Sequence, residues 1–198
     1  MIQKVFANKI IKHSQSLDQA RRTLQALSAE ILSGSKRAIF AFHRGDAAQA
    51  KQELASAREK LKEGWKLVKS ESRIAQEGMW RAAQEEFAEA DLFDQFLSQG
   101  MVGKVNGVAE DPDIFLGAVS DLTGELVRRA VLLATEGKEK EVEKIFQGVT
   151  EVVEFLLRMD LTGTLRTKVD QAKQNLRKLE EIRYDSGSTT HCGHCSCV

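Results

Sequence analysis

Apolar side chains recur along the chain with the period of an α-helix. Near the N-terminus they lie three, four or seven positions apart, at Phe6, Ile10, Leu17, Leu24, Leu27 and Ile31. This spacing places them on one side of a helix. We therefore predict a first long helix from about Ile2 to Phe42, with a bend near Gly34.

Five further helices are predicted from the same periodicity and from helix-ending residues. Gly45 and Asp46 indicate the end of the first helix and the N-cap of the second. The glycine-spaced stretch 100–107 interrupts the pattern, and the only proline, Pro112, suits the first turn of the next helix. The predicted spans are about 47–69, 72–98, 113–135, 138–159 and 165–184. Their short connections favour antiparallel neighbours, so the fold class is an all-α antiparallel bundle.

Composition adds limits to this picture. A chain of 198 residues with 42% apolar content can bury one core, and we predict a single helical domain over residues 1–185. The 29 Lys and Arg balance the 29 Asp and Glu, so only local patches can attract a polyanion. No run of apolar residues is long enough to cross a bilayer. We expect a cytoplasmic protein with no membrane partner.

The three cysteines lie together at the C-terminus, in a tail over residues 186–198. Cys192, Cys195 and Cys197 stand within the last seven residues, where they cannot staple a core, and this favours a reducing compartment. The tract 191–197 offers ligands for zinc or copper. Because one short tract after a Ser/Gly-rich linker is a weak metal site, we interpret it as a flexible tail and assign no metal to it.

Two groups of acidic residues have helical spacing. Glu86 and Glu89 are three positions apart on the predicted third helix, and Asp121 and Glu125 are four apart on the predicted fourth, so each pair shares a face. If the two helices pack together, four carboxylates converge. Carboxylate oxygens suit Mg²⁺, with Mn²⁺ as an alternative, and neither group contains the histidine of a di-iron site. Glu85 is expected to point away.

The alternative for these acids is a solvated face neutralised by Lys and Arg one turn away. The Glu86–Glu89 edge has no base at those positions, which hold Ala90 and Phe93, while Asp91 and Asp94 add negative charge nearby. Such repulsion is relieved by a bound cation. Spacing alone is nevertheless more typical of a solvated acidic face, so both interpretations stay open at this point.

Candidate contacts to nucleic acid are two local groups of cations. The first is Lys36, Arg37 and Arg44, and the second is Arg73 and Arg81. We expect them to bind phosphates, with ordinary surface charge as the alternative. Trp80, next to Arg81, is a candidate for stacking on a base or for a place in the core.

Several stretches resemble the translin family, and within it the translin-associated factor X group. Ser35–Arg44 is similar to the signature at the end of that family's first long helix. Gln84–Ala90 and Asp121–Leu126 resemble its two acidic motifs, and Leu165–Asp170 with Lys178–Asp185 resembles its last helix. The matches keep one order over about residues 10–185.

The resemblance implies a bundle of six to seven helices that assembles into a closed oligomer, and a Mg²⁺-dependent endoribonuclease acting on RNA. In the matching motifs, Glu86, Glu89 and Asp121 take the positions of metal-binding catalytic carboxylates, and Glu125 that of a fourth acid, completing the metal site or accepting a proton from water. The alternative is a non-catalytic protein of the translin type that binds single-stranded RNA or DNA. The short chain is more similar to homologues that assemble alone, which implies a homo-octamer.

Overall fold

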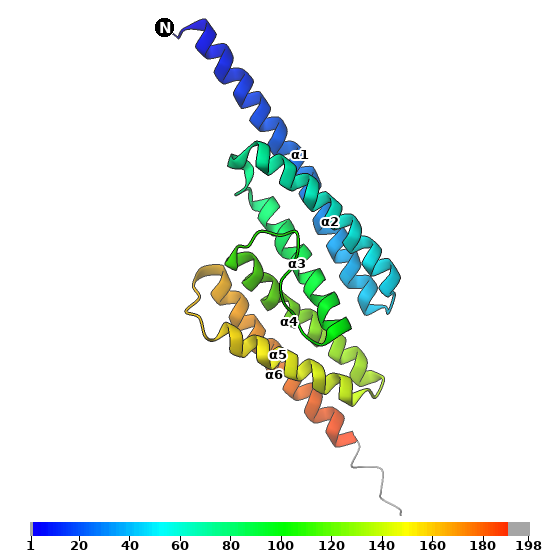
Figure 1. The fold of residues 1–198 in the computed structure, drawn as a ribbon. Helices are drawn as coiled ribbons and strands as arrows, with labels where there is room; N and C mark the ends of the chain where they lie inside the picture. Colours follow the sequence, from blue (N-terminus) through cyan, green and yellow to red (C-terminus); the bar gives the residue numbers. More distant parts are fainter. Residues whose placement is uncertain (1, 190–198) are drawn as a thin grey trace, which may run out of the picture. The chain divides into compact units, whose positions relative to one another are not determined.

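The computed structural model describes the backbone of residues 2–189 and the side chains of residues 2–185. Within this part the chain forms six α-helices, one turn of 3-10 helix and no strand (Figure 1). The elements are α1 (Lys4–His43), α2 (Ala47–Ser70), η1 (Ser72–Ile74), α3 (Gly78–Gln99), α4 (Pro112–Thr135), α5 (Glu139–Leu156) and α6 (Gly163–Thr189). The predicted all-α class is confirmed.

The residues that end and begin the helices act as the sequence predicts. Gly45 adopts a φ of 79°, a left-handed conformation that glycine reaches without steric cost, and it ends α1. The Asp46 side chain accepts a backbone N–H in the first turn of α2 at 3.0 Å. Asp111 caps α4 in the same way at 2.9 Å, and Pro112 occupies the first turn. These caps satisfy N–H groups that have no partner within the helix.

The predicted third helix is wrong at its start. Ser72–Ile74 forms a separate 3-10 turn, and α3 begins only at Gly78. The carboxylate of Glu71 accepts the backbone N–H of Arg73 and also binds its guanidinium, which holds the chain in this turn. Local side-chain bonds of this kind compete with the regular helix. Ile74 is fully buried and anchors the turn.

Two other boundaries differ from the prediction by at least three residues. The helix α5 ends at Leu156 rather than at 159. The helix α6 extends to Thr189, so the residues that begin the predicted linker, from Ser186, are helical. Helix ends are set by local capping and by packing partners, which apolar periodicity does not report.

By its contacts the chain divides into two compact units. The first comprises the residues up to Phe87 together with Asn106–Ala109, and the second comprises Ala88–Val105 together with the chain from Glu110 onward. The division falls within α3. The single domain predicted for residues 1–185 stays a prediction.

The core of the first unit lies between α1 and α2, which form an antiparallel hairpin (Figure 1). Its buried apolar side chains come from both helices, from η1 and from the start of α3: Leu24, Ile31, Leu54, Leu61, Ile74, Trp80 and Phe87. Trp65 meets Trp80 edge to face, with ring centroids 5.4 Å apart. The Trp80 ring lies directly over Gly64, where no side chain intervenes.

The first turns of α1 carry large apolar side chains that stay exposed. Ile2, Val5, Phe6, Ile10 and Ile11 are all at least half exposed, whereas the buried positions of α1 begin only at Leu24. In Figure 1 the N-terminal turns of α1 extend past the end of α2. We call residues 2–11 the N-terminal apolar segment.

In the second unit α4, α5 and α6 pack pairwise against one another. The buried side chains include Phe93 from the end of α3, Leu122 and Leu126 from α4, Val149 from α5 and Leu179 from α6. Asn175 on α6 donates a hydrogen bond to the Thr123 hydroxyl on α4 at 2.8 Å. This bond joins α6 to α4. No described helix is both long and apolar enough to span a membrane.

Candidate catalytic and nucleic-acid-binding residues

The acidic side chains of α3 are not a solvated face. Glu89, in the second unit, is only 9% exposed, and so is Asp91, which accepts a hydrogen bond from Gln95 at 2.9 Å. Glu86, in the first unit, is partly buried and lies 3.8 Å from the ammonium of Lys36. Glu85 is partly buried as well. Because burying a carboxylate is costly, the solvated-face alternative is wrong for Glu89.

Asp121 is held by a lysine that the sequence interpretation did not single out. The ammonium of Lys168 on α6 forms a close ion pair with the Asp121 carboxylate on α4. The two side chains are 23% and 39% exposed, respectively. Lys168 lies in the stretch that carries the resemblance of the last helix, but its partner, 47 positions away, is defined only by the packing of α6 on α4.

Glu125 lies one turn after Asp121 on α4, as its spacing predicts. Its carboxylate is 3.8 Å from the guanidinium of Arg128, and the glutamate side chain is partly buried. Asp121, Glu125 and Glu89 all belong to the second unit.

The chemistry of these donors fits a hard divalent cation. Carboxylate oxygens are the ligands that Mg²⁺ and Mn²⁺ prefer, and Asp121 already attracts a cationic group, the Lys168 ammonium. Within the part of the chain that the structure describes, no three His, Cys, Asp or Glu side chains come close enough together to hold a metal ion. The Cys and His tract at 191–197 lies outside the described residues.

The predicted phosphate-binding cations all lie in the first unit, and each has a neighbouring polar partner. Arg37 donates to both carboxylate oxygens of Glu53 at 2.9 and 2.8 Å, and this bond lowers the pKa of Glu53. Arg44 donates to the Gln49 amide oxygen at 2.8 Å. Lys36 is exposed beside Glu86.

Arg73 and Arg81 do not share one helix, so that part of the prediction is wrong. Arg73 lies in η1, where its two bonds to Glu71 lower the pKa of that carboxyl to about 2. Arg81 is on α3, 3.4 Å from the Gln76 amide oxygen. Glu77, which lies between them in the sequence, accepts a hydrogen bond from Arg21 on α1 at 2.8 Å.

Of the two alternatives for Trp80, the structure confirms the core, and the exposed aromatic side chain beside a cation group is Phe40. Trp80 is fully buried, so it belongs to the core and not to a base-stacking surface. Phe40 is 50% exposed, and the guanidinium of Arg44 lies over its ring, 4.9 Å from the centroid. Lys36, Phe40 and Arg44 are four positions apart in succession, a spacing that places them on one face. That spacing was the available sequence signal.

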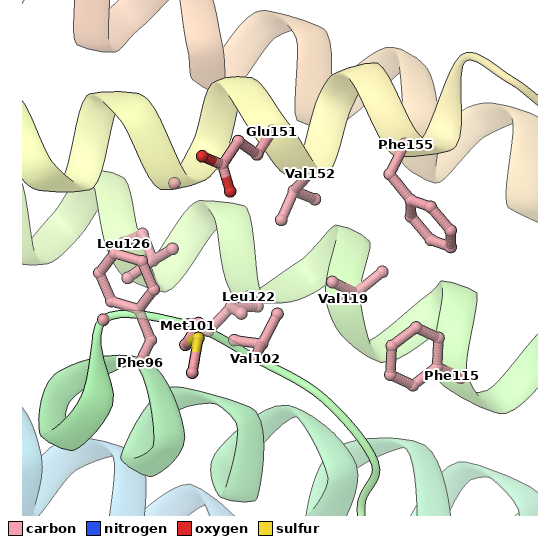
Figure 2. Close-up of a pocket in the computed structure, with 12 residues that line it drawn as sticks. Phe96, Met101, Val102, Phe115, Val119, Leu122, Leu126, Glu151, Val152 and Phe155 are labelled. Carbon is pink, nitrogen blue, oxygen red and sulfur yellow. The ribbon is translucent and has the colours of Figure 1, made fainter.

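A pocket of about 300 Å³ opens in the second unit between the end of α3, the loop after it, α4 and α5. Figure 2 shows it lined by apolar side chains, among them Phe96, Met101, Phe115 and Phe155, with Glu151 as its only carboxylate. None of the predicted acids lines it. The pocket therefore lacks the polar groups that phosphoryl chemistry requires.

Fold and site together define an all-α protein of antiparallel helices with buried or ion-paired acids on its third and fourth helices. The profile of the Translin family matches residues 7–187, and the chain belongs to this family. A search of curated protein sequences gives no match.

Solved structures of similar fold carry the name C3PO. The structure of apo-NeC3PO superposes with a TM-score of 0.84 at 18% identity, covering 94% of this chain and 98% of that one. A complex of AfC3PO with duplex RNA gives 0.83 at 22% identity, covering 95% and 99%. AfC3PO itself gives 0.83 at 24% identity, covering 92% and 97%. At these identities the likeness shows the fold.

Proposed function

We propose that this chain is an RNA-binding, Mg²⁺-dependent endoribonuclease of the translin-associated factor X type, working in an oligomer. The observation that carries the catalytic part is the acid set: a translin-family chain with a buried Glu89 on α3 and a cation-binding Asp121 on α4. The RNA part is supported by the similarly folded AfC3PO, whose structure is a complex with duplex RNA.

The face that carries Lys36, Phe40 and Arg44 is the proposed RNA contact. Lysine and arginine bind phosphates, and an exposed aromatic ring stacks on unpaired bases. The guanidinium of Arg44 lies over the Phe40 ring, so a cation and an aromatic ring are adjacent on this face. Salt should weaken the binding, since phosphate contacts release counterions.

The residues proposed to hold Mg²⁺ are Glu86, Glu89, Asp121 and Glu125. When bound, the ion would neutralise charge on the phosphoryl oxygens and make water a better nucleophile. The three carboxylates of Glu86, Glu89 and Asp121 would position it. Glu125, one turn from Asp121, would complete the site or accept a proton from the attacking water.

The test is a cleavage assay on a labelled single-stranded RNA. We expect internal cleavage in Mg²⁺ or Mn²⁺ and none in EDTA. In a filter-binding assay the protein should retain RNA both with the metal and with EDTA. Binding without cleavage under every metal condition would contradict the nuclease proposal and favour a non-catalytic nucleic-acid-binding protein of the translin type. The same assay with single-stranded DNA measures the preference for RNA.

The N-terminal apolar segment supports the proposed self-association. Five large apolar side chains at least half exposed on a few helical turns form a surface that isolated proteins seldom leave in water. A homo-octamer is the proposed state, and we propose that this segment lies in one of its interfaces.

Placing charges in the segment should therefore break the assembly. We expect the double variant Phe6→Asp and Ile10→Asp to lower the mass measured by light scattering, with the helical circular dichroism signal unchanged, because two aspartates cannot be buried unpaired in an apolar interface. Asn8→Asp adds one charge at a polar position of the same segment and is the control. An unchanged mass in the double variant would exclude this segment from the interface.

A further inference from the structure

The Lys168 ammonium is paired with a carboxylate, Asp121, that the proposed function assigns to a divalent cation. It forms a close ion pair with the Asp121 carboxylate, and both side chains are partly buried between α4 and α6. The proposed function assigns no role to Lys168.

The packing of α6 on α4 keeps the backbone of Lys168 at this position. Asn175 is two turns further along α6 on the same side as Lys168, and it is hydrogen-bonded to Thr123 on α4 at 2.8 Å. Val169, next to Lys168, is buried. The backbone of α6 is thus anchored at Val169 and at Asn175, both C-terminal to Lys168, and the lysine stem starts from a defined point.

An ammonium and a divalent cation are alternative partners for one carboxylate. If both are close, they repel each other, and the repulsion is stronger in a partly buried site than in water because the effective dielectric constant is lower. The lysine stem is long and flexible, so its charged group can move away while α6 stays in place. Asp121 can then exchange one cation for the other without a change in fold.

We propose that Lys168 is the resident counterion of Asp121 and competes with the divalent cation for this carboxylate. Without metal, Lys168 neutralises Asp121 and stabilises α6 on α4. With metal bound, the ammonium is displaced. Lys168 is then a positioning residue that sets the metal concentration the protein requires. This inference rests on the proposed metal site.

The test measures the dissociation constant of Mn²⁺ for the full-length protein. Electron paramagnetic resonance reports the concentration of the ion that stays unbound. Methionine replaces lysine with a side chain of similar length and no charge. We expect Lys168→Met to bind Mn²⁺ about tenfold more tightly than the unmodified protein, and to melt at a lower temperature in EDTA. Lys168→Gln, which retains a hydrogen-bond donor, should bind Mn²⁺ more tightly as well.

Two control variants separate competition from general loss of charge. Lys173→Met removes another lysine of α6, one that pairs with Asp170 at 3.2 Å, and it should leave Mn²⁺ affinity unchanged. Adding Asp121→Asn to Lys168→Met should abolish the gain in affinity, because the carboxylate for which the two cations compete is gone.

Each outcome decides between the inference and the proposed function. If the unmodified protein binds Mn²⁺ and Lys168→Met binds it equally or more weakly, the inference is wrong and the metal site stands. If only Lys168→Met binds Mn²⁺, Lys168 excludes the metal completely in the unmodified protein, and the competition is demonstrated. If neither binds Mn²⁺, both the metal site and the inference fall.

Discussion

Replacing Glu89 by glutamine, or Asp121 by asparagine, is expected to lower the rate of Mg²⁺-dependent RNA cleavage by about a hundredfold or more. Loss of a group that merely orients a metal ligand costs about 10- to 100-fold, and these two carboxylates are the proposed ligands themselves. Both substitutions keep the shape of the side chain. Single-turnover cleavage at saturating Mg²⁺ measures the loss.

Binding and fold should survive in both variants. The proposed RNA contact lies on Lys36, Phe40 and Arg44, which neither substitution touches, so the RNA dissociation constant should stay within about threefold of the unmodified protein. Asp121→Asn also weakens the pair with Lys168, which for a partly exposed ion pair costs about 1 kcal/mol or less. Glu154→Gln, an exposed carboxylate on α5, is the matched control with full activity expected.

Cleavage at the unmodified rate in Glu89→Gln and Asp121→Asn would remove these residues from the proposed catalytic set. A parallel loss of RNA binding would instead mean that the acids shape the RNA surface and not the chemical step.

A second large effect is expected at Gly64, where α2 packs against Trp80. A Cβ atom at this position would lie 2.5 and 2.6 Å from two carbons of the indole ring, which is far inside normal contact. Trp80 is fully buried and cannot move aside without disturbing the core. We expect Gly64→Ala to lower the free energy of unfolding by about 2–3 kcal/mol, as other overpacked cores do.

Gly34 on α1 is the matched control for Gly64. It is also a buried helical glycine, but a Cβ there would meet its nearest neighbour at 3.7 Å, an ordinary contact. Gly34→Ala should therefore be neutral or stabilising by up to about 1 kcal/mol, because alanine favours the helix. Urea unfolding of both variants tests the pair, and equal stabilities would mean that Trp80 can repack.

Most helix boundaries could be predicted because their causes are local. The apolar period, the left-handed Gly45 and the caps at Asp46 and Asp111 act within a few residues. The 3-10 turn at Ser72–Ile74 was missed, although its bond between Glu71 and Arg73 is local too, because apolar periodicity carries no information about such side-chain bonds.

The candidate site was proposed from residue spacing together with the family resemblance, but the partners of its residues could not be predicted. Spacing alone placed Asp121 with Glu125, and Glu86 with Glu89, each on one face of a helix. Spacing could not show that Glu89 is buried, that Trp80 belongs to the core, or that Phe40 is the exposed aromatic ring beside Arg44. Burial depends on which other helices pack against a helix face, and the residues of that face do not specify those helices.

By itself the sequence determined the all-α class, the order of the helices and the candidate acids, because periodicity, capping and residue chemistry are properties of short segments. Only the tertiary structure decided which charges are neutralised and by which residue. The pairing of Lys168 with Asp121 joins positions 47 apart. It exists because α6 packs on α4 in one register, which the sum of many apolar contacts selects.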